Sequence, residues 1–342
     1  MSARTVRPPF DGDKIRIGVI GTGFGAMVHL PALTEMDGVE VTAVCSSRLK
    51  RAREVAGRYA IPTVVEDFRE LLDGNVVDAV TIAVPPFLHH PMALAAMEAG
   101  VHVLCEKPLA RTAAEARDLE RMAADTGVCT AVAFHRRYEP ARLEMKQYID
   151  KGFIGQLHSV SVIVYRSTLA EAEDRYHSWL MEDEKGGGVL SAIGSHYVDQ
   201  LRWWFGEIHA VTGARFTAIE SRPVRGSHVR REVDADDNTA FVLRFANGAI
   251  GSVSISYTAA SDVGEEIVAS GSDGMLAIQE PDQLVGSRRG DQIRSLLKHD
   301  RPLPSGIKRQ IVPFQQLAGN WIQAIRDGSE ATPSFADGAR VQ

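Results

Sequence analysis

The sequence predicts two domains, an α/β domain built on a parallel sheet and then an α+β domain built on an open, mainly antiparallel sheet. Its 342 residues fit two domains at about 150 residues each. Up to about residue 135, apolar segments alternate with helix-like segments, as they do in βαβ units. Beyond about residue 150, polar and apolar residues alternate with a period of two, which indicates antiparallel strands with one solvated face. We therefore expect a flexible lead-in over 1–13, a first domain over 14–135 and a second over 136–342.

Five apolar segments of the first domain are predicted strands. They cover residues 15–20, 39–44, 78–84, 101–105 and 129–134. Helices are predicted between them, over 89–99 and over 112–125. Helices on both faces would bury a parallel sheet completely, which explains why the strands are apolar throughout rather than alternating.

Strands of the second domain show the alternating pattern over residues 159–164 and 251–257. Phe241, Leu243 and Phe245 are expected to share one face of a further strand. Asn247-Gly248 follows, a pair that favours a type I′ hairpin turn into the next strand.

Composition excludes several classes of protein. The formal net charge of −6 gives no reason to expect a nucleic-acid partner. Cys45, Cys105 and Cys129 stand far apart, a sparse odd count that is typical of a reducing compartment. The first residues lack the apolar core of a signal peptide, and no apolar run approaches the roughly 20 residues of a membrane helix. A cytoplasmic protein without a membrane partner is expected, and no metal-ligand pattern is present in the sequence.

A glycine-rich segment follows the first predicted strand and opens a helix-like stretch. It matches G-x-G-x-x-G/A, in which the first glycine permits a tight turn and the second lets the backbone approach a pyrophosphate. A purely structural glycine turn is the alternative. Because the segment follows the first strand, we predict that residues 14–135 form a Rossmann domain that binds NAD(P). The expected cofactor contacts are Gly21, Thr22, Gly23, Phe24, Gly25 and Ala26.

The end of the second strand favours NADP over NAD. An acidic residue there would bind the ribose hydroxyls of NAD, but no carboxylate occurs before Glu54. Hydroxyls and cations occur instead, and these suit a 2′-phosphate. The residues concerned are Ser46, Ser47, Arg48, Lys50 and Arg51. In the alternative interpretation, the cations only solvate the next helix.

Two further segments lie one helix apart and carry a family resemblance. Pro85 begins a P-x-x-x-H stretch that ends at His89, and residues 99–109 read AGVHVLCEKPL. The combination strongly resembles the glucose–fructose oxidoreductase and inositol dehydrogenase family (Gfo/Idh/MocA). Residues 186–199, GGGVLSAIGSHYVD, and residues 333–338, PSFADG, resemble other family segments, so the likeness runs from about residue 14 to the end.

Lys107 is the first expected catalytic residue. It lies just past the C-terminal end of a predicted parallel strand, the edge where open α/β sheets bind ligands. A lysine there can hydrogen-bond a substrate oxygen and stabilise negative charge that develops on it; the alternative is a surface lysine. The resemblance implies that Lys107 binds substrate and cofactor, that Pro85, His89 and Glu106 lie near the cofactor, and that the bond to Pro108 is often cis.

His196 is the second expected catalytic residue. It is predicted on a helix but off the apolar stripe of that helix, which consists of Leu190, Ile193, Tyr197, Leu201 and Trp204. The family places its proton-transferring histidine here and commonly an aspartate four residues earlier, where this chain has Ala192. Asp199 is expected to support His196. Other candidates to orient the ring are Tyr165, Tyr176 and His177.

The resemblance implies NAD(P)-dependent hydride transfer to or from a secondary alcohol or ketone of a sugar, sugar acid or cyclitol. Arg137, in the segment between the domains, and Tyr165 are expected substrate contacts. A homodimer or homotetramer is implied. Trp179-Leu180 replaces a common Trp-Arg pair, and the chain ends where relatives usually continue into another helix. Two alternatives stay open, a catalytically silent NAD(P)-binding sensor, favoured by Ala192, and an NAD-dependent glycosidase of the same fold.

Overall fold

The computed structural model describes residues 10, 12–73, 76–279, 282–297 and 308–342. The predicted lead-in over 1–13 therefore lies outside the described residues, except for residues 10, 12 and 13. The chain divides into two compact units. Unit 1 comprises the described residues of Met1–Tyr138 and Pro304–Gln342, and unit 2 those of Glu139–Leu303.

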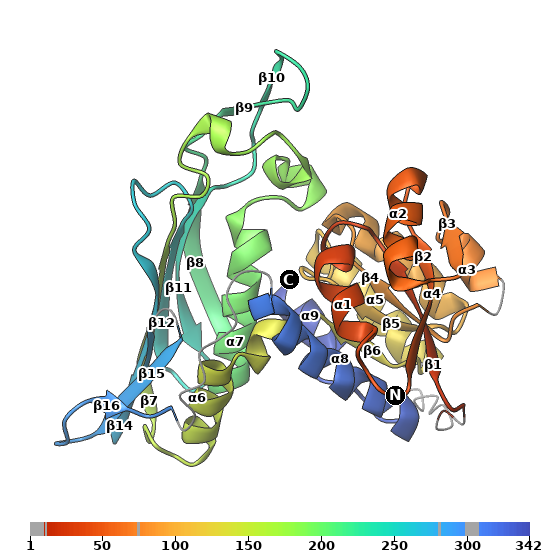
Figure 1. The fold of residues 1–342 in the computed structure, drawn as a ribbon. Coiled ribbons are helices and arrows are strands. Elements are labelled where there is room, and N and C mark those ends of the chain that lie inside the picture. Colours follow the sequence, from red (N-terminus) through yellow and green to blue (C-terminus); the bar gives the residue numbers. More distant parts are fainter. Residues whose placement is uncertain (1–9, 11, 74–75, 280–281, 298–307) are drawn as a thin grey trace. The chain divides into compact units, whose positions relative to one another are not determined.

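Unit 1 contains a six-stranded, fully parallel sheet with the order β3-β2-β1-β4-β5-β6 (Figure 1). Its strands are β1 (Ile15–Ile20), β2 (Val39–Cys45), β3 (Thr63–Val65), β4 (Ala79–Ile82), β5 (His102–Cys105) and β6 (Thr130–Val132). The predicted parallel sheet and its five strands are confirmed. The additional strand, β3, has only three residues, all half-buried, and so lacks the apolar run that identifies the others.

Helices cover both faces of this sheet. The helical elements are η1 (Gly25–His29), α1 (Leu30–Leu33), α2 (Leu49–Tyr59), α3 (Arg69–Asp73), η2 (Pro86–Leu88), α4 (His89–Glu98), α5 (Ala113–Thr126), η3 (His135–Tyr138), α8 (Lys308–Asp327) and α9 (Phe335–Val341). Alternate residues of β1 point to opposite faces, so Val19 belongs to the core that α2 and α8 share, and Ile20 belongs to the core that α4, α5 and α9 share. Burial on both faces accounts for the apolar strands.

The C-terminal segment belongs to unit 1, which differs from the sequence-based division at residue 136. On α8, Phe314, Leu317 and Trp321 are almost fully buried in the core beside β1. On α9, Phe335 enters the core on the other face of the sheet. An amphipathic helical pattern shows that a helix is buried, but it does not show which core receives it.

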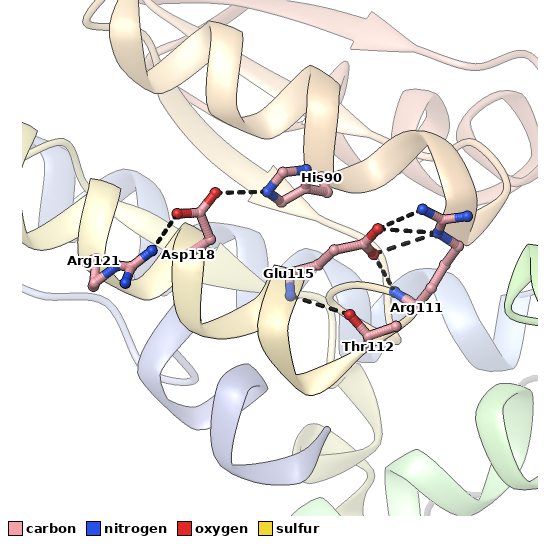
Figure 2. A network of polar contacts seen from close by, with 6 residues as sticks. All are labelled: His90, Arg111, Thr112, Glu115, Asp118 and Arg121. Atoms are coloured by element: carbon pink, nitrogen blue, oxygen red, sulfur yellow. Dashed lines mark hydrogen bonds and ion pairs between the residues drawn. The ribbon is translucent and has the colours of Figure 1, made fainter.

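Polar contacts join α4 and α5 on the surface of unit 1 (Figure 2). His90 Nε2 lies 2.9 Å from Asp118 Oδ2, and Arg121 donates to the other oxygen of Asp118. These hydrogen bonds lower the pKa of Asp118. The Thr112 hydroxyl accepts from the backbone N–H of Glu115 and caps the N-terminus of α5, which fixes where that helix begins.

Unit 2 is built on an eight-stranded sheet with the order β16-β15-β14-β13-β7-β12-β11-β8. Its strands are β7 (Leu157–Tyr165), β8 (Ile208–Phe216), β11 (Asn238–Phe245), β12 (Ile250–Ser256), β13 (Gly264–Gly271), β14 (Gly274–Gln279), β15 (Gln283–Arg288) and β16 (Arg294–Ser295). A separate hairpin pairs β9 (Ser221–Pro223) with β10 (Arg230–Glu232). Neighbouring strands are antiparallel except for β7 and β12, so the predicted mainly antiparallel sheet is confirmed.

The helices of unit 2 are α6 (Pro140–Asp150), η4 (Ala172–Asp174), η5 (Trp179–Met181), η6 (Asp183–Lys185), η7 (Leu190–Gly194) and α7 (Ser195–Phe205). Figure 1 shows α6 and α7 against one face of the large sheet. Phe241, Leu243 and Phe245 are buried beneath them, and Val242 on the opposite face is exposed. The predicted shared face of these three residues is therefore confirmed.

The predicted type I′ turn at Asn247-Gly248 is wrong. A type I′ turn needs positive φ at both central residues, but of this pair only Gly248 has it, at 89°. The Gly248 N–H donates to the Phe245 carbonyl and the Phe245 N–H donates to the Ala249 carbonyl, which makes the loop one residue longer than predicted. Among the described helices, none combines the length and apolar character that a membrane crossing needs.

Candidate functional site

The glycine-rich loop of unit 1 lies between β1 and η1, at the C-terminal edge of the parallel sheet. Gly21 has φ of 110°, and a Cβ atom there would lie 2.2 Å from the carbonyl oxygen of Ala83, so the fold itself requires glycine. A Cβ atom at Gly23 would meet no heavy atom within 4 Å. The second glycine thus leaves open space where a ligand can approach the backbone, which fits a pyrophosphate.

Hydroxyl groups connect this loop to the end of β2. Thr22 Oγ1 lies 3.0 Å from Ser46 Oγ, and the backbone N–H of Arg48 donates to the same Ser46 oxygen at 3.2 Å. Ser47, Arg48 and Arg51 are exposed, and the first turn of α2 contains no acidic residue. The structure therefore brings the predicted cationic segment next to the glycine-rich loop.

Lys107 follows β5 at the same edge of the sheet, in a turn whose Lys107–Pro108 peptide is cis. The preceding Glu106 is buried, and its two carboxylate oxygens have different partners. Oε1 lies 3.1 Å from His29 Nε2, and Oε2 accepts a hydrogen bond of 3.2 Å from the Lys107 backbone N–H. The buried Glu106 carboxylate therefore fixes the backbone of the lysine turn.

The charges around this turn oppose one another. Burial lowers the pKa of Lys107, the Glu106 carboxylate raises it, and Arg136 lowers it further. Burial opposes ionisation of Glu106, but the hydrogen bond from His29, together with nearby positive charge, holds its pKa below the usual value. The net result is a buried carboxylate beside a lysine that gives up its proton more readily than an exposed one.

His89 braces the same turn from the other side. Its ring is fully buried, with Nδ1 2.8 Å from the Pro108 carbonyl oxygen and Nε2 2.8 Å from the Val84 carbonyl oxygen. Burial lowers the pKa of His89. Both ring nitrogens face the protein, so His89 joins the Lys107 turn to the loop that contains Pro85.

The segment after β6 contributes further buried polar groups to unit 1. The His135 ring stacks against Phe24 of the glycine-rich loop, with 6.2 Å between ring centroids. Arg137 is buried, and its guanidinium group lies 3.6 Å from Asp337 of α9. Arg137 is thus held against the C-terminal helix.

In unit 2, His196 lies in the first turn of α7, directly after the π-helical segment η7. Asp236 holds the start of η7, because its carboxylate accepts from the Leu190 N–H and its carbonyl from the Val189 N–H. The predicted helix that contains Leu190 and Ile193 is present, but its first five residues are π-helical and α-helical geometry begins only at Ser195. His196 was expected off the apolar stripe but is only 4% exposed, and Asp199 is also buried.

Other predicted groups of unit 2 have partners of their own. Tyr165 ends β7, and its hydroxyl lies 3.2 Å from Ser254 Oγ. Arg225 lies over the ring of the exposed Tyr176, and His177 Nε2 lies 3.0 Å from the Glu232 carbonyl oxygen. Ala192 lies inside η7. Of these candidates, only Asp199 shares a helix with His196.

Sequence reasoning missed two buried features. One is the contact of His29 with Glu106, for which no motif gave a signal. The other is a network in unit 2 in which the Tyr197 hydroxyl donates to Glu265, and Arg142 pairs with both Glu265 and Glu139. The spacing of Glu139 and Arg142 at i and i+3 on α6 would suggest that pair, but Glu265 is 123 residues from Arg142 and only the fold reveals it.

Both parts of the chain match domains of one known protein family. Residues 15–134 match the NAD-binding Rossmann fold of the Gfo/Idh/MocA oxidoreductase family, and residues 143–277 match the C-terminal domain of that family. An uncharacterized oxidoreductase of Synechocystis sp. is 31% identical over 96% of this chain and 91% of its own length. Levoglucosan dehydrogenase of Pseudarthrobacter phenanthrenivorans is 29% identical over 96% of this chain and 93% of its own.

The solved structure of levoglucosan dehydrogenase in complex with NADH and levoglucosan superimposes with a TM-score of 0.88, covering 96% of this chain and 94% of that chain at 29% identity. Over 58% of this chain and 54% of its own length, scyllo-inositol 2-dehydrogenase (NADP(+)) of Bacillus subtilis is 30% identical. The glycine-rich loop, the parallel sheet and the full-length match lead to one conclusion: this chain belongs to the Gfo/Idh/MocA family of NAD(P)-dependent oxidoreductases.

Proposed function

We propose that this protein transfers hydride between NADP(H) and the carbon of a secondary alcohol or ketone in a sugar, sugar acid or cyclitol. The observation that carries the proposal is the Lys107 turn, held by Glu106 and His89 at the sheet edge that also presents the glycine-rich loop. Relatives whose names state their substrates act on levoglucosan, a glucoside and an inositol, all polyhydroxylated rings.

The residues of unit 1 fit a dinucleotide. The open space at Gly23 and the backbone N–H groups that begin η1 would receive the pyrophosphate. Ser46, Ser47, Arg48 and Arg51 would hold a 2′-phosphate. Pro85 and Glu106 would border the nicotinamide end, with His89 bracing their loops from behind. When bound, the nicotinamide accepts or supplies the hydride.

Lys107 and His196 are the proposed catalytic residues. The Lys107 ammonium group would donate a hydrogen bond to the substrate oxygen and stabilise the negative charge that develops on it during oxidation. His196 would take the hydroxyl proton, and in reduction it would return it. Asp199 would support the His196 ring, and Arg137 and Tyr165 would contact the substrate.

Turnover of polyols and keto-sugars, followed by NADPH absorbance, tests this function. Net reduction or oxidation of at least one polyhydroxylated ring is the expected result. Stoichiometric dinucleotide binding without turnover would favour the silent sensor instead, for which Ala192 is the supporting residue. Release of free sugar from an aryl glycoside without net change in the cofactor would identify the glycosidase.

Alanine at the two loop glycines should separate folding from cofactor binding. Gly21→Ala is expected to lower the free energy of unfolding by more than about 1 kcal/mol, because it combines positive φ with a backbone clash. Gly23→Ala should leave stability nearly unchanged and weaken dinucleotide binding, because its Cβ atom occupies the open space. Thermal unfolding and titration of NADPH fluorescence measure the two effects. Equal NADPH affinity in Gly23→Ala and the unmodified protein would contradict the proposed pyrophosphate position.

Cofactor preference should follow the segment after β2. Arg48→Ala is expected to weaken NADPH binding about tenfold, since a charge-assisted contact contributes roughly 1.5 kcal/mol, with NADH binding nearly unchanged. Ser46→Asp should favour NADH, because a carboxylate binds ribose hydroxyls and repels a phosphate. Titration with both dinucleotides measures the preference. Tighter binding of NADH than of NADPH by the unmodified protein would overturn the proposal.

We also infer that the open face of the large sheet in unit 2 forms subunit contacts in a homodimer or homotetramer. Val242 on β11 is 54% exposed, and Ile250 on the neighbouring strand β12 is 56% exposed. Ser252, which pairs with Val242, and Ser254 lie on the same face of β12 as Ile250. Light scattering should give a mass of two or four chains, and Val242→Glu should lower it because the substitution buries a charge. A monomer at micromolar concentration would exclude this contact.

A further inference from the structure

His29 is a buried histidine for which neither the glycine-rich motif nor the proposed reaction provides a role. It is the last residue of η1, the helix that follows the glycine-rich loop, and its side chain is 0% exposed. The ring stacks on Phe314 of α8 with 4.1 Å between centroids, and the Phe24 ring meets it edge-on at 5.8 Å. These two aromatic contacts fix the plane of the imidazole.

The fixed ring directs Nε2 at the Glu106 carboxylate, 77 residues along the chain. Since Oε2 of that carboxylate accepts from the Lys107 N–H, Glu106 forms a direct link between the helix behind the cofactor loop and the lysine turn. A buried carboxylate without a hydrogen-bond donor is costly. His29 and the Lys107 backbone supply one donor to each oxygen.

The charged and titratable groups that face Glu106 come from several elements. They include His29 of η1, His89 of α4, Cys105 of β5, Lys107 itself and His135 of η3. Arg136 of η3 acts on Lys107. Glu106 is the negative group among them, and its charge opposes the effects of burial and of Arg136 on Lys107. An ionised Glu106 therefore favours the protonated form of Lys107.

We propose that His29 is a positioning residue that acts through the Glu106 carboxylate to hold the Lys107 turn in place and keep its amino group cationic. This inference rests on the proposed role of Lys107 at the substrate oxygen. His29 touches neither substrate nor reacting atoms. It stabilises the carboxylate, and the carboxylate orients the lysine backbone and favours the ammonium form that can donate to a substrate oxygen.

The test is the pH dependence of Lys107 acylation by an amine-reactive reagent, measured on the full chain by peptide mass spectrometry. Glu106→Gln removes the negative charge and keeps the size of the side chain. His29→Leu removes the donor, and His29→Gln replaces it with an amide donor. His90→Gln is the matched control, because His90 pairs with Asp118 on the surface of the same unit.

Glu106→Gln is expected to shift the acylation profile of Lys107 toward lower pH by about one unit, the usual effect of removing one nearby opposite charge. His29→Leu should shift it in the same direction by a smaller amount, because loss of the donor raises the pKa of Glu106 and releases its carboxylate from its fixed place beside the lysine turn. His29→Gln should restore most of the profile, and His90→Gln should not change it. If His29→Leu does not fold, His29→Met, which also lacks a hydrogen-bond donor, takes its place.

An unchanged acylation profile in His29→Leu, with the variant folded by thermal unfolding, would overturn the inference, whether or not Glu106→Gln shifts the profile. Because acylation needs no substrate, the result is separate from the proposed function. A shifted profile in a protein that turns over no substrate would support the role of His29 while the proposed function fails. Loss of turnover in Lys107→Met, with unchanged acylation profiles in the other variants, would support the proposed function and contradict the role of His29.

Discussion

Replacing Lys107 by methionine is expected to lower kcat/KM for a confirmed sugar or cyclitol substrate by about 10²- to 10³-fold. Loss of one hydrogen-bond donor aimed at developing negative charge costs roughly 2.7 to 4 kcal/mol of transition-state stabilisation. Methionine has a similar length and no charge, and therefore fills the same space in the turn without the donor. Steady-state kinetics on both proteins at saturating NADPH or NADP gives the ratio.

The dependence of activity on pH gives a second test of the role of Lys107. Burial lowers the pKa of Lys107, so the ammonium form is lost as pH rises through that lowered value. A reaction that needs the ammonium form should therefore decline at a lower pH than the roughly 10.4 of an ordinary lysine. This alkaline decline should be absent from the residual activity of Lys107→Met.

Lys151→Met is the matched control for this substitution, since Lys151 is an exposed lysine at the end of α6. It should retain normal kinetics. Full turnover by Lys107→Met, with the same alkaline limb as the unmodified protein, would remove Lys107 from the mechanism.

Much of the fold could be predicted because it depends on local patterns. Five of the six parallel strands were predictable to within about two residues at each end, since each is a buried apolar run between helical segments, whereas the half-buried β3 was not. Gly21 was predictable because only glycine takes its backbone conformation beside Ala83 without a clash. Features that depend on local geometry rather than on apolar spacing were missed. The spacing of Leu190 and Ile193 does not distinguish an α-helix from the π-helical η7.

The rest of the candidate site depends on contacts between distant segments. The ring of His29 could be assigned to Glu106 only once β1 and β5 were placed in one sheet. Likewise, α8 has an apolar stripe that is visible in the sequence, but only the packing of Trp321 shows that this stripe belongs to a core of unit 1. Motifs therefore predicted which residues hold a ligand, whereas the buried groups that support them required the fold.

The second large effect is expected in unit 2, where Arg142 lies between two carboxylates. Arg142, Glu139 and Tyr197 are all buried, and Arg142 contacts both Glu139 and Glu265. Arg142→Met is expected to lower the free energy of unfolding of unit 2 by about 3 to 5 kcal/mol, because it leaves buried charges without a partner. Since Tyr197 lies next to His196 on α7, the same network also anchors the helix of the proposed proton-transferring residue.

Urea unfolding followed by tryptophan fluorescence measures this loss, since three of the four tryptophans, Trp179, Trp203 and Trp204, lie in unit 2. Tyr197→Phe should cost only about 1 kcal/mol, since it removes one hydrogen bond and no charge. The combination of Arg142→Met with Glu139→Gln and Glu265→Gln should recover much of the loss, because no unpaired charge then remains. A loss below about 1 kcal/mol in Arg142→Met alone would mean that water reaches the two carboxylates and that the network does not support α7.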